Sequence, residues 1–266
     1  MKRPGRVPDS PFWVEPGDID PAGGRLHLSP EESHHLLRVF RASAGTPFEA
    51  IDGSGLLYRC VLEETERGIA VGRVESKVEE SGELPLELGL LVGLPDMAQV
   101  ESILTHAIPL GATSIDFFGA ERSSQGALSA QKLDRMERLS RSALKQSRRS
   151  RLPALRSSTG LGAALEGILE GGEKYLADPG GEEGLGLPGD LKETWQPHGI
   201  IAIGPPGGFL EVELEQLRSR GFRAISLGPS RLSTSTATFA LLTVVRNLLL
   251  IHRLPRVDKT GLSGYL

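Results

Sequence analysis

From Leu84 onward, strand-like apolar segments alternate with helical patterns, and this alternation constrains the fold more than any other feature. The strand-like segments are residues 85–94, 112–118, 174–179, 200–204 and 222–228. The helical patterns are residues 96–110, 128–150, 162–170, 211–220 and 234–252. Strands that alternate with helices are typical of a mostly parallel sheet covered on both faces. The sequence therefore predicts an α/β domain over residues 84–266.

The first 82 residues have a different pattern and predict a small β-rich domain. One helix is expected at residues 30–41, because Ser29 can cap it and two glutamates lie in its first turn. The polar segment 79–83 is interpreted as a linker. The expected strands are residues 47–53, 55–64 and 68–77. We therefore expect two domains, 1–82 and 84–266.

Composition places the chain among soluble globular proteins, with 39% hydrophobic and 24% charged residues. The one cysteine, Cys60, excludes an internal disulfide framework and fits a reducing cytoplasm. No apolar run approaches the roughly 18 residues that a membrane span needs, and no signal peptide is recognisable. No Cys/His cluster has metal-ligand spacing. We expect a cytoplasmic protein that binds neither a membrane nor a metal.

Positive charge is concentrated in one segment of an acidic chain. Residues 135–156 contain seven arginines and one lysine against one glutamate, a net charge of +7. Because the whole chain carries −4, the remainder carries −4 − 7 = −11. Such a contrast indicates a nucleic-acid partner more strongly than the total charge does.

Helical spacing gives this segment two faces. Apolar residues at 133, 136, 139 and 143 are expected to face the core. Four cations recur at i, i+3, i+7 and i+10 on another face and predict contact with RNA phosphates, although a solvated face is the alternative. These cations are Arg138, Arg141, Lys145 and Arg148.

The segment IAIGPPGGF, residues 201–209, is a buried strand that ends in a glycine-proline loop. A nucleoside-triphosphate loop would continue with Lys and Ser or Thr, and a dinucleotide fingerprint would need G-x-G-x-x-G spacing. Neither is present, and Glu211 and Glu213 would repel a phosphate. The loop suits a neutral or cationic ligand held by main-chain groups. An ordinary strand-to-helix turn is the alternative.

A second segment, ISLGPSRLSTSTATFALL, repeats this design after the strand at residues 222–228. Ligands in open parallel sheets lie at the carboxyl ends of strands. We therefore expect the two Gly-Pro loops to form one continuous ligand-binding surface.

Together, IGPPGGF and LGPSRLSTSTA resemble the paired signature of the 16S rRNA (uracil-N3)-methyltransferases, a branch of the SPOUT superfamily. That family typically has IGPEGG and LG-x-R-I-L-R-x-E-T-A. Three further segments match in order, so the resemblance spans nearly the whole chain: HHLLRVFRASAG, FEAIDGSG and KQSRRSRLP.

The resemblance implies a PUA-like β-barrel that binds RNA at residues 1–82 and a trefoil-knotted SPOUT domain at residues 84–266. It implies a homodimer that binds S-adenosylmethionine and acts on 16S rRNA or the small ribosomal subunit. Arg149 and Arg151 match family arginines and are added to the expected RNA contacts. The implied cofactor contacts are Ala177, Ile203, Gly204, Gly207, Gly208, Leu227, Gly228, Leu232 and Thr234.

Several charged family positions are occupied by uncharged residues here. Pro206 and Ser235 replace glutamates, and Ser230 and Ser233 replace arginines. Arg231 lies one position from a missing arginine and is the candidate catalytic residue, since a cation would stabilise an anionic uracil. A surface arginine is the alternative interpretation.

Two functions follow from these observations. The leading hypothesis is methylation of a uridine N3 in 16S rRNA. The other is a catalytically impaired RNA-binding factor that retains the methyltransferase fold, which the lost charges favour. A nucleotide-dependent oxidoreductase is disfavoured because its fingerprint is missing.

Overall fold

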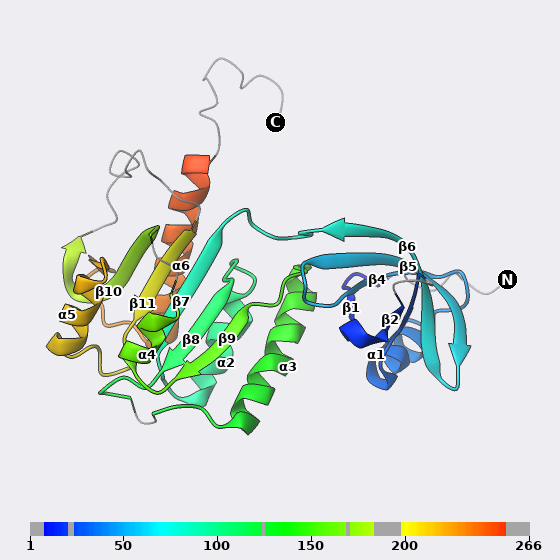
Figure 1. Ribbon diagram of the computed structural model, residues 1–266, viewed down its shortest axis with the longest axis horizontal. Helices are drawn as coiled ribbons and strands as arrows, with labels where there is room; N and C mark the ends of the chain where they lie inside the picture. Colours follow the sequence, from blue (N-terminus) through cyan, green and yellow to red (C-terminus); the bar gives the residue numbers. More distant parts are fainter. Residues whose placement is uncertain (1–7, 21–23, 124–125, 169–170, 184–197, 254–266) are drawn as a thin grey trace, which may run out of the picture. The chain divides into compact units, whose positions relative to one another are not determined.

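The computed structural model of the chain describes residues 8–20, 24–123, 126–168, 171–183 and 198–253. The chain forms two compact units (Figure 1). Unit 1 comprises Met1–Glu83 and Arg135–Pro153, and unit 2 comprises Leu84–Asp134 and Ala154–Leu266. Within the described ranges, no helix is long and apolar enough to cross a bilayer.

Unit 1 is built on a six-stranded sheet in the order β1-β4-β5-β6-β3-β2. Neighbouring strands run antiparallel except β1 and β4, which are parallel. The predicted β-rich character is confirmed, but the short strands β1, β2 and β3 are too brief to leave a sequence pattern. The strands are β1 (Phe12–Trp13), β2 (Ile19–Asp20), β3 (Arg25–His27), β4 (Pro47–Ile51), β5 (Leu56–Glu66) and β6 (Ile69–Glu79), with a 3₁₀ turn η1 (Pro16–Asp18).

The predicted helix at residues 30–41 is present in two parts. Ser29 accepts a hydrogen bond from the Glu32 N–H at 3.2 Å and caps α1 (Pro30–His34), as expected. The chain then continues as the π-helix η2 (His35–Val39). Phe12 lies beneath this segment, and its ring meets those of Phe40 and Phe48 edge-on at 6.1 and 5.8 Å.

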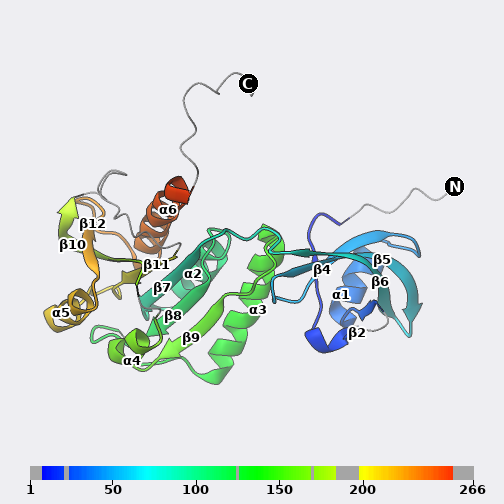
Figure 2. The ribbon, with the colours of Figure 1, turned by 45° about the horizontal axis from the view of Figure 1, so that its top comes forward.

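Unit 2 contains a fully parallel sheet in the order β12-β10-β11-β7-β8-β9 (Figures 1 and 2). β9 was not predicted, because its sequence ALRSS has no apolar run. The strands are β7 (Glu87–Gly93), β8 (Ser114–Phe118), β9 (Ala154–Ser158), β10 (Glu173–Glu183), β11 (His198–Ile203) and β12 (Arg223–Ser226).

Helices cover both faces of this sheet, as predicted. Ile200 and Ala202 of β11 pack in one hydrophobic cluster with α4 (Leu161–Glu166) and α5 (Glu211–Ser219). Gly199 belongs to the opposite face, where a Cβ would lie 3.1 Å from Leu249 of α6. On that face α2 (Met97–Ala107) packs against α6 (Thr234–Arg253).

Among the element ends that differ from the prediction, those of β10 and α3 bear on the candidate sites. β10 continues past residue 179 to Glu183, with a register shift between Ala177 and Glu182. The predicted helix at residues 128–150 is α3 (Ala130–Ser147). Arg148 follows it with a φ of 57°, so the predicted helical face stops one turn early.

Glu83 is the hydrogen-bond acceptor that fixes the turn after α3. Its carboxylate accepts from Arg149 Nε and Nη2 at 3.0 and 2.6 Å, and from the N–H groups of Ser150 and Arg151 at 2.9 and 2.8 Å. The side chains of Arg149 and Glu83 are only 4% and 5% exposed. This buried pair explains why Arg135–Pro153 belong to the same compact unit as Met1–Glu83.

We predict that Arg149→Met lowers the free energy of unfolding by about 3–5 kcal/mol, because it leaves the Glu83 carboxylate buried without its cation. Arg151→Met is the matched control, since the Arg151–Glu80 pair is 46% and 54% exposed and its loss is worth at most about 1 kcal/mol. Urea unfolding followed by circular dichroism measures both. Equal destabilisation by the two variants would contradict the prediction.

We also predict that the Cys60 thiol is unreactive in the folded protein. Burial, followed by the nearby Glu75 charge, raises the pKa of Cys60 to about 12. Its ordinary pKa is about 8.5, so the unfolded chain ionises first and stability falls as the pH rises above that value. At pH 8, dithiobis-nitrobenzoate should react at least about a hundredfold faster after unfolding in guanidinium chloride. Equal rates would show that Cys60 is accessible.

Candidate functional site

The two Gly-Pro loops meet at the carboxyl edge of the unit 2 sheet, as the sequence predicts. Thr234 Oγ1 donates a hydrogen bond to the Gly204 carbonyl at 3.2 Å. Arg231 Nη2 donates to the Pro206 carbonyl at 3.3 Å. Side chains of the second loop therefore bind main-chain carbonyls of the first, and the two loops form one continuous surface.

The first loop rests on the end of β7. The Gly208 N–H donates to the Pro205 carbonyl at 2.8 Å and closes a tight turn, with Gly208 at a φ of 73°. A Cβ on Gly93, the last residue of β7, would lie 2.5 Å from the Pro205 Cδ. Glycine at 93 thus permits the loop to approach the strand, and glycine at 208 permits the turn.

Strand register brings the other expected cofactor residues to the same edge. Ala177 of β10 lies level with Ile203 of β11 and Ile225 of β12. Ile203 is buried, Ala177, Leu227 and Leu232 are half-buried, and Thr234 is 3% exposed.

Open space lies beside two of the expected glycines. Among the described residues, no heavy atom outside the adjoining chain comes within 4 Å of a Cβ position on Gly208 or Gly228, where φ is +73° and +98°. The edge therefore leaves main-chain groups of both loops accessible to a ligand.

Arg122 is a site residue that the sequence analysis missed. It lies in the loop after β8, and its Nη1 donates a hydrogen bond to the Gly207 carbonyl at 2.7 Å. A Cβ on Gly207 would come within 3.0 Å of the Arg122 Cβ, so the arginine side chain lies along the loop. The place of Arg122 after the carboxyl end of a predicted strand was the signal that could have identified it.

Glu213 holds the segment that carries Arg122. Its side chain is buried, with Oε1 accepting from the Glu121 N–H at 3.1 Å and Oε2 accepting from the Leu210 N–H at 2.8 Å. One carboxylate thereby fixes both the start of α5 and the residue before Arg122.

The serines at charged family positions organise the start of α6. Ser233 Oγ accepts from the Thr236 N–H at 3.2 Å and lies 2.8 Å from Thr236 Oγ1, which makes Ser233 an N-terminal cap. The Ser235 N–H donates to Gln99 Oε1 of α2 at 3.3 Å. These residues therefore have structural partners in place of charge.

The expected RNA contacts on and after α3 mostly face carboxylates of unit 1. Arg141 bonds Glu15 and Glu137 at 2.5 and 2.6 Å, and its guanidinium lies 4.5 Å from the centre of the Trp13 ring. Arg138 differs, because it is exposed and has no ion-pair partner among the described residues. The remaining pairs are Lys145 with Glu32, Arg148 with Glu49, Arg149 with Glu83 and Arg151 with Glu80.

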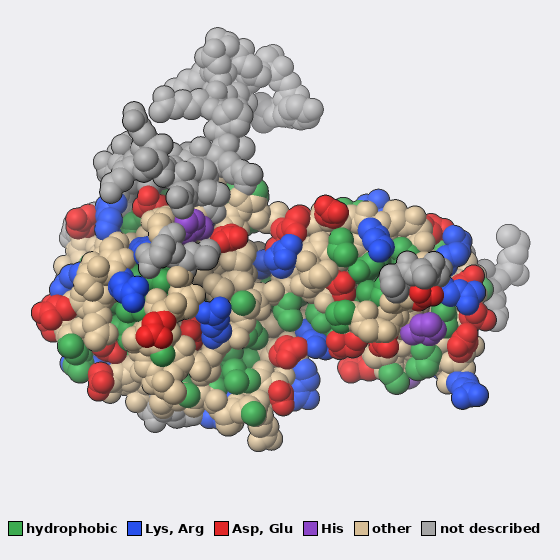
Figure 3. Space-filling view, viewed as in Figure 1, with side chains coloured by type: hydrophobic (Ala, Val, Ile, Leu, Met, Phe, Trp, Pro, Cys, Tyr) green, Lys and Arg blue, Asp and Glu red, His purple; other side chains and the backbone are tan. Residues whose placement is uncertain are grey.

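These pairs account for much of the +7 charge. Each acid except Glu137 comes from residues 1–83, so the excess cations of one segment neutralise acids of another. On the face of unit 1 that Figure 3 shows at the right, blue and red side chains are interspersed and form no uniform basic patch. Contact of all the predicted cations with RNA phosphates stays a prediction.

Two protein families match the sequence of this chain. An RNA methyltransferase domain family matches residues 82–246, and an RNA methyltransferase PUA domain family matches residues 28–75. Ribosomal RNA small subunit methyltransferase E of Synechocystis sp. is 30% identical over 223 residues, which cover 84% of this chain and 73% of that protein. The Bacillus subtilis protein of the same name is 25% identical, with 82% and 88% covered.

Solved structures show the same fold. A Legionella pneumophila protein described as a methyltransferase, in complex with the bound cofactor SAM, superposes with a TM-score of 0.74 at 25% identity and covers 89% of this chain and 97% of its own. Ribosomal RNA small subunit methyltransferase E from Neisseria gonorrhoeae, bound to S-adenosyl methionine, has a TM-score of 0.76 at 24% identity, with 90% and 97% covered.

The expected α/β fold of a SPOUT methyltransferase with an N-terminal PUA-like domain is thus confirmed. With a family match over residues 82–246 and a relative at 30% identity, this chain belongs to the RNA methyltransferase family that includes ribosomal RNA small subunit methyltransferase E.

Proposed function

We propose that this chain uses S-adenosylmethionine to methylate N3 of a uridine in 16S rRNA, as free RNA or in the small ribosomal subunit. The observation that carries this proposal is the joined surface of the two Gly-Pro loops, held by Thr234 on Gly204 and by Arg231 on Pro206. Family membership supports the reaction class, and the names of the relatives support the substrate.

The loop surface fits the cofactor chemically. Adenine and ribose can be held by main-chain N–H and carbonyl groups, and a sulfonium requires that no cation be forced against it. The residues proposed to hold it carry no charge: Ala177, Ile203, Gly204, Gly207, Gly208, Leu227, Gly228, Leu232 and Thr234. When bound, S-adenosylmethionine supplies a methyl group activated by its positively charged sulfur.

The chain must hold the uracil ring and favour loss of its weakly acidic N3 proton. A guanidinium stays protonated and has five N–H donors, of which Arg231 uses one on Pro206. Its remaining donors are available to the oxygens of an anionic uracil, where a fixed cation stabilises developing charge. Arg122, also exposed and also bonded to this loop, is a second cation at the same edge.

Arg122 and Arg231 therefore supply positive charge where Ser230 and Ser233 have none. This favours an active enzyme over the alternative, a catalytically impaired RNA-binding factor. The alternative is supported by two replacements of charged family residues. Pro206 stands in place of a glutamate, and Ser233, in place of an arginine, caps α6.

Further properties are proposed on the resemblance of the sequence to the uracil-N3 family. Residues 1–82 would form the RNA-binding domain, residues 84–266 would contain the trefoil knot, and two copies would associate as a homodimer in the cytoplasm. The single cysteine, which cannot form a disulfide within the chain, fits a reducing compartment.

We predict transfer of labelled methyl from S-adenosylmethionine to unmodified small ribosomal subunits, mapped to a uridine N3. Arg231→Ala should lower kcat about a hundredfold, the size of effect seen when one charge-stabilising donor is removed. Arg218→Ala is the matched control, because Arg218 is an exposed arginine of α5 paired with Glu211. Protein that binds cofactor and RNA but transfers no methyl would establish the impaired factor instead.

We predict that Gly93→Ala weakens S-adenosylmethionine binding at least about tenfold, because the new methyl group must displace Pro205 and the loop behind it. Gly162→Ala in α4, where no atom of the described part of the chain outside the helix itself lies within 4 Å of the new Cβ, should bind as the wild type does. Isothermal titration calorimetry measures both affinities, and thermal melting verifies that each variant is folded. Undiminished affinity of folded Gly93→Ala would remove the loop from the cofactor site.

A further inference from the structure

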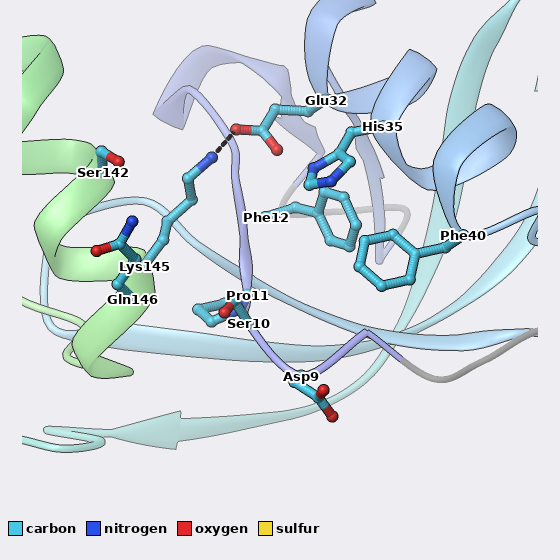
Figure 4. A pocket seen from close by; sticks show the side chains of 10 residues that line it. All are labelled: Asp9, Ser10, Pro11, Phe12, Glu32, His35, Phe40, Ser142, Lys145 and Gln146. Carbon is cyan, nitrogen blue, oxygen red and sulfur yellow. Dashed lines mark hydrogen bonds and ion pairs between the residues drawn. The ribbon is translucent and has the colours of Figure 1, made fainter.

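Unit 1 contains a cavity of about 450 Å³ that the proposed methyl-transfer chemistry does not use. Its lining residues come from the segment before β1, from α1 and η2, and from α3 (Figure 4). Ligand pockets in proteins have volumes of about 300–1,000 Å³. The lining residues are Asp9, Ser10, Pro11, Phe12, Glu32, His35, Phe40, Ser142, Lys145 and Gln146.

Three rings form one wall of this cavity. His35 lies 5.0 Å from Phe40 and 5.8 Å from Phe12, measured between ring centres, and the Phe12 and Phe40 rings are 6.1 Å apart. Phe12 is 2% exposed and fixed in the core, whereas His35 is exposed and Phe40 is half-buried. Phe12 therefore fixes the inner part of the wall, and the outer part, with the exposed His35 ring, is accessible to a flat ligand.

Ser142, Lys145 and Gln146 of α3 lie across the cavity from the rings, and Glu32 of α1 lies beside His35 (Figure 4). Gln146 is exposed and offers both an amide donor and an amide acceptor. The ion pair between Lys145 and Glu32 places an ammonium and a carboxylate beside it, with side chains 25% and 11% exposed. Donors and acceptors thus lie opposite an aromatic surface.

We propose that this cavity binds one unpaired nucleobase of the substrate RNA, an inference that rests on the proposed function. Proteins recognise single-stranded RNA by stacking splayed-out bases on aromatic rings and by hydrogen bonding to their edges. The exposed His35 ring supplies the stacking surface, and the Phe40 ring, tilted by 51° against it, forms the side of the wall. Gln146, Lys145 and Glu32 supply the edge contacts.

Cations with no carboxylate partner among the described residues are available for the flanking phosphates. Arg38 lies in η2 beside the ring-bearing residues, and Arg41 directly follows Phe40. Arg138 lies two turns before Lys145 on α3. All three are exposed. They differ from Arg141, Arg148 and Arg151, whose guanidinium groups face glutamates.

The test measures binding of a fluorescein-labelled single-stranded RNA oligonucleotide to the full chain by fluorescence anisotropy. His35→Ala should weaken binding about tenfold, within the range found when one base-stacking side chain is removed, and His35→Phe should restore it. His34→Ala is the matched control, an exposed neighbour that does not line the cavity. Gln146→Ala should also weaken binding. Its matched control is Gln131→Ala, because Gln131 is an exposed glutamine of the same helix.

Unlabelled single-stranded RNA should compete for the protein much better than a duplex of the same sequence. Wild-type affinity of both His35→Ala and Gln146→Ala, or equal competition by the duplex, would overturn the proposal. Calorimetry with S-adenosylmethionine should give the same affinity for every variant. A chain that loses RNA binding on His35→Ala but never methylates small subunits would refute the proposed function and leave the cavity assignment standing.

Discussion

The parallel pairing of β11 between β10 and β7 is the constraint on which the candidate site depends. Because Ile203 lies level with Ala177 on one side and with Val92 on the other, residues of three strands lie together at one edge of the sheet. A one-residue change of register would exchange the β11 side chains between the two covered faces of the sheet. It would also separate Gly93 from Pro205, whose contact seats the first loop. The loop geometry therefore follows from strand register more than from contacts within the loop.

Much of this arrangement could be predicted from sequence, because local patterns carried the information. Apolar runs identified five of the six parallel strands, and Gly-Pro sequences after two of them identified the joined loops. β9 escaped because an edge strand with polar residues has no distinctive periodicity. Arg122 escaped for a different reason. Its position after a predicted strand placed it at the carboxyl edge of the sheet, but its contact with Gly207 spans 85 positions of sequence and could not be inferred from that position alone.

The basic segment shows why charge counts alone do not identify a nucleic-acid surface. Helical spacing placed the cations on one face correctly up to Ser147, but it could not show what that face meets. Glu15, Glu32 and Glu49 are far from α3 in sequence, and each lies against one of its cations or against Arg148 just beyond it. Among the exposed arginines outside these pairs, Arg138 was predicted to contact RNA, whereas Arg38 and Arg41 lie in a segment without such a concentration of charge.

Unit 1 is assembled from two separate stretches of chain, Met1–Glu83 and Arg135–Pro153, and the backbone passes between units after residues 83, 134 and 153. A gene fragment that ends at the linker would encode Glu15, Glu32 and Glu83 without the cations that neutralise them. Recombination between related genes would face the same difficulty, because one crossover cannot transfer the whole unit. The two stretches of chain that form unit 1 must therefore be inherited together with the segment between them.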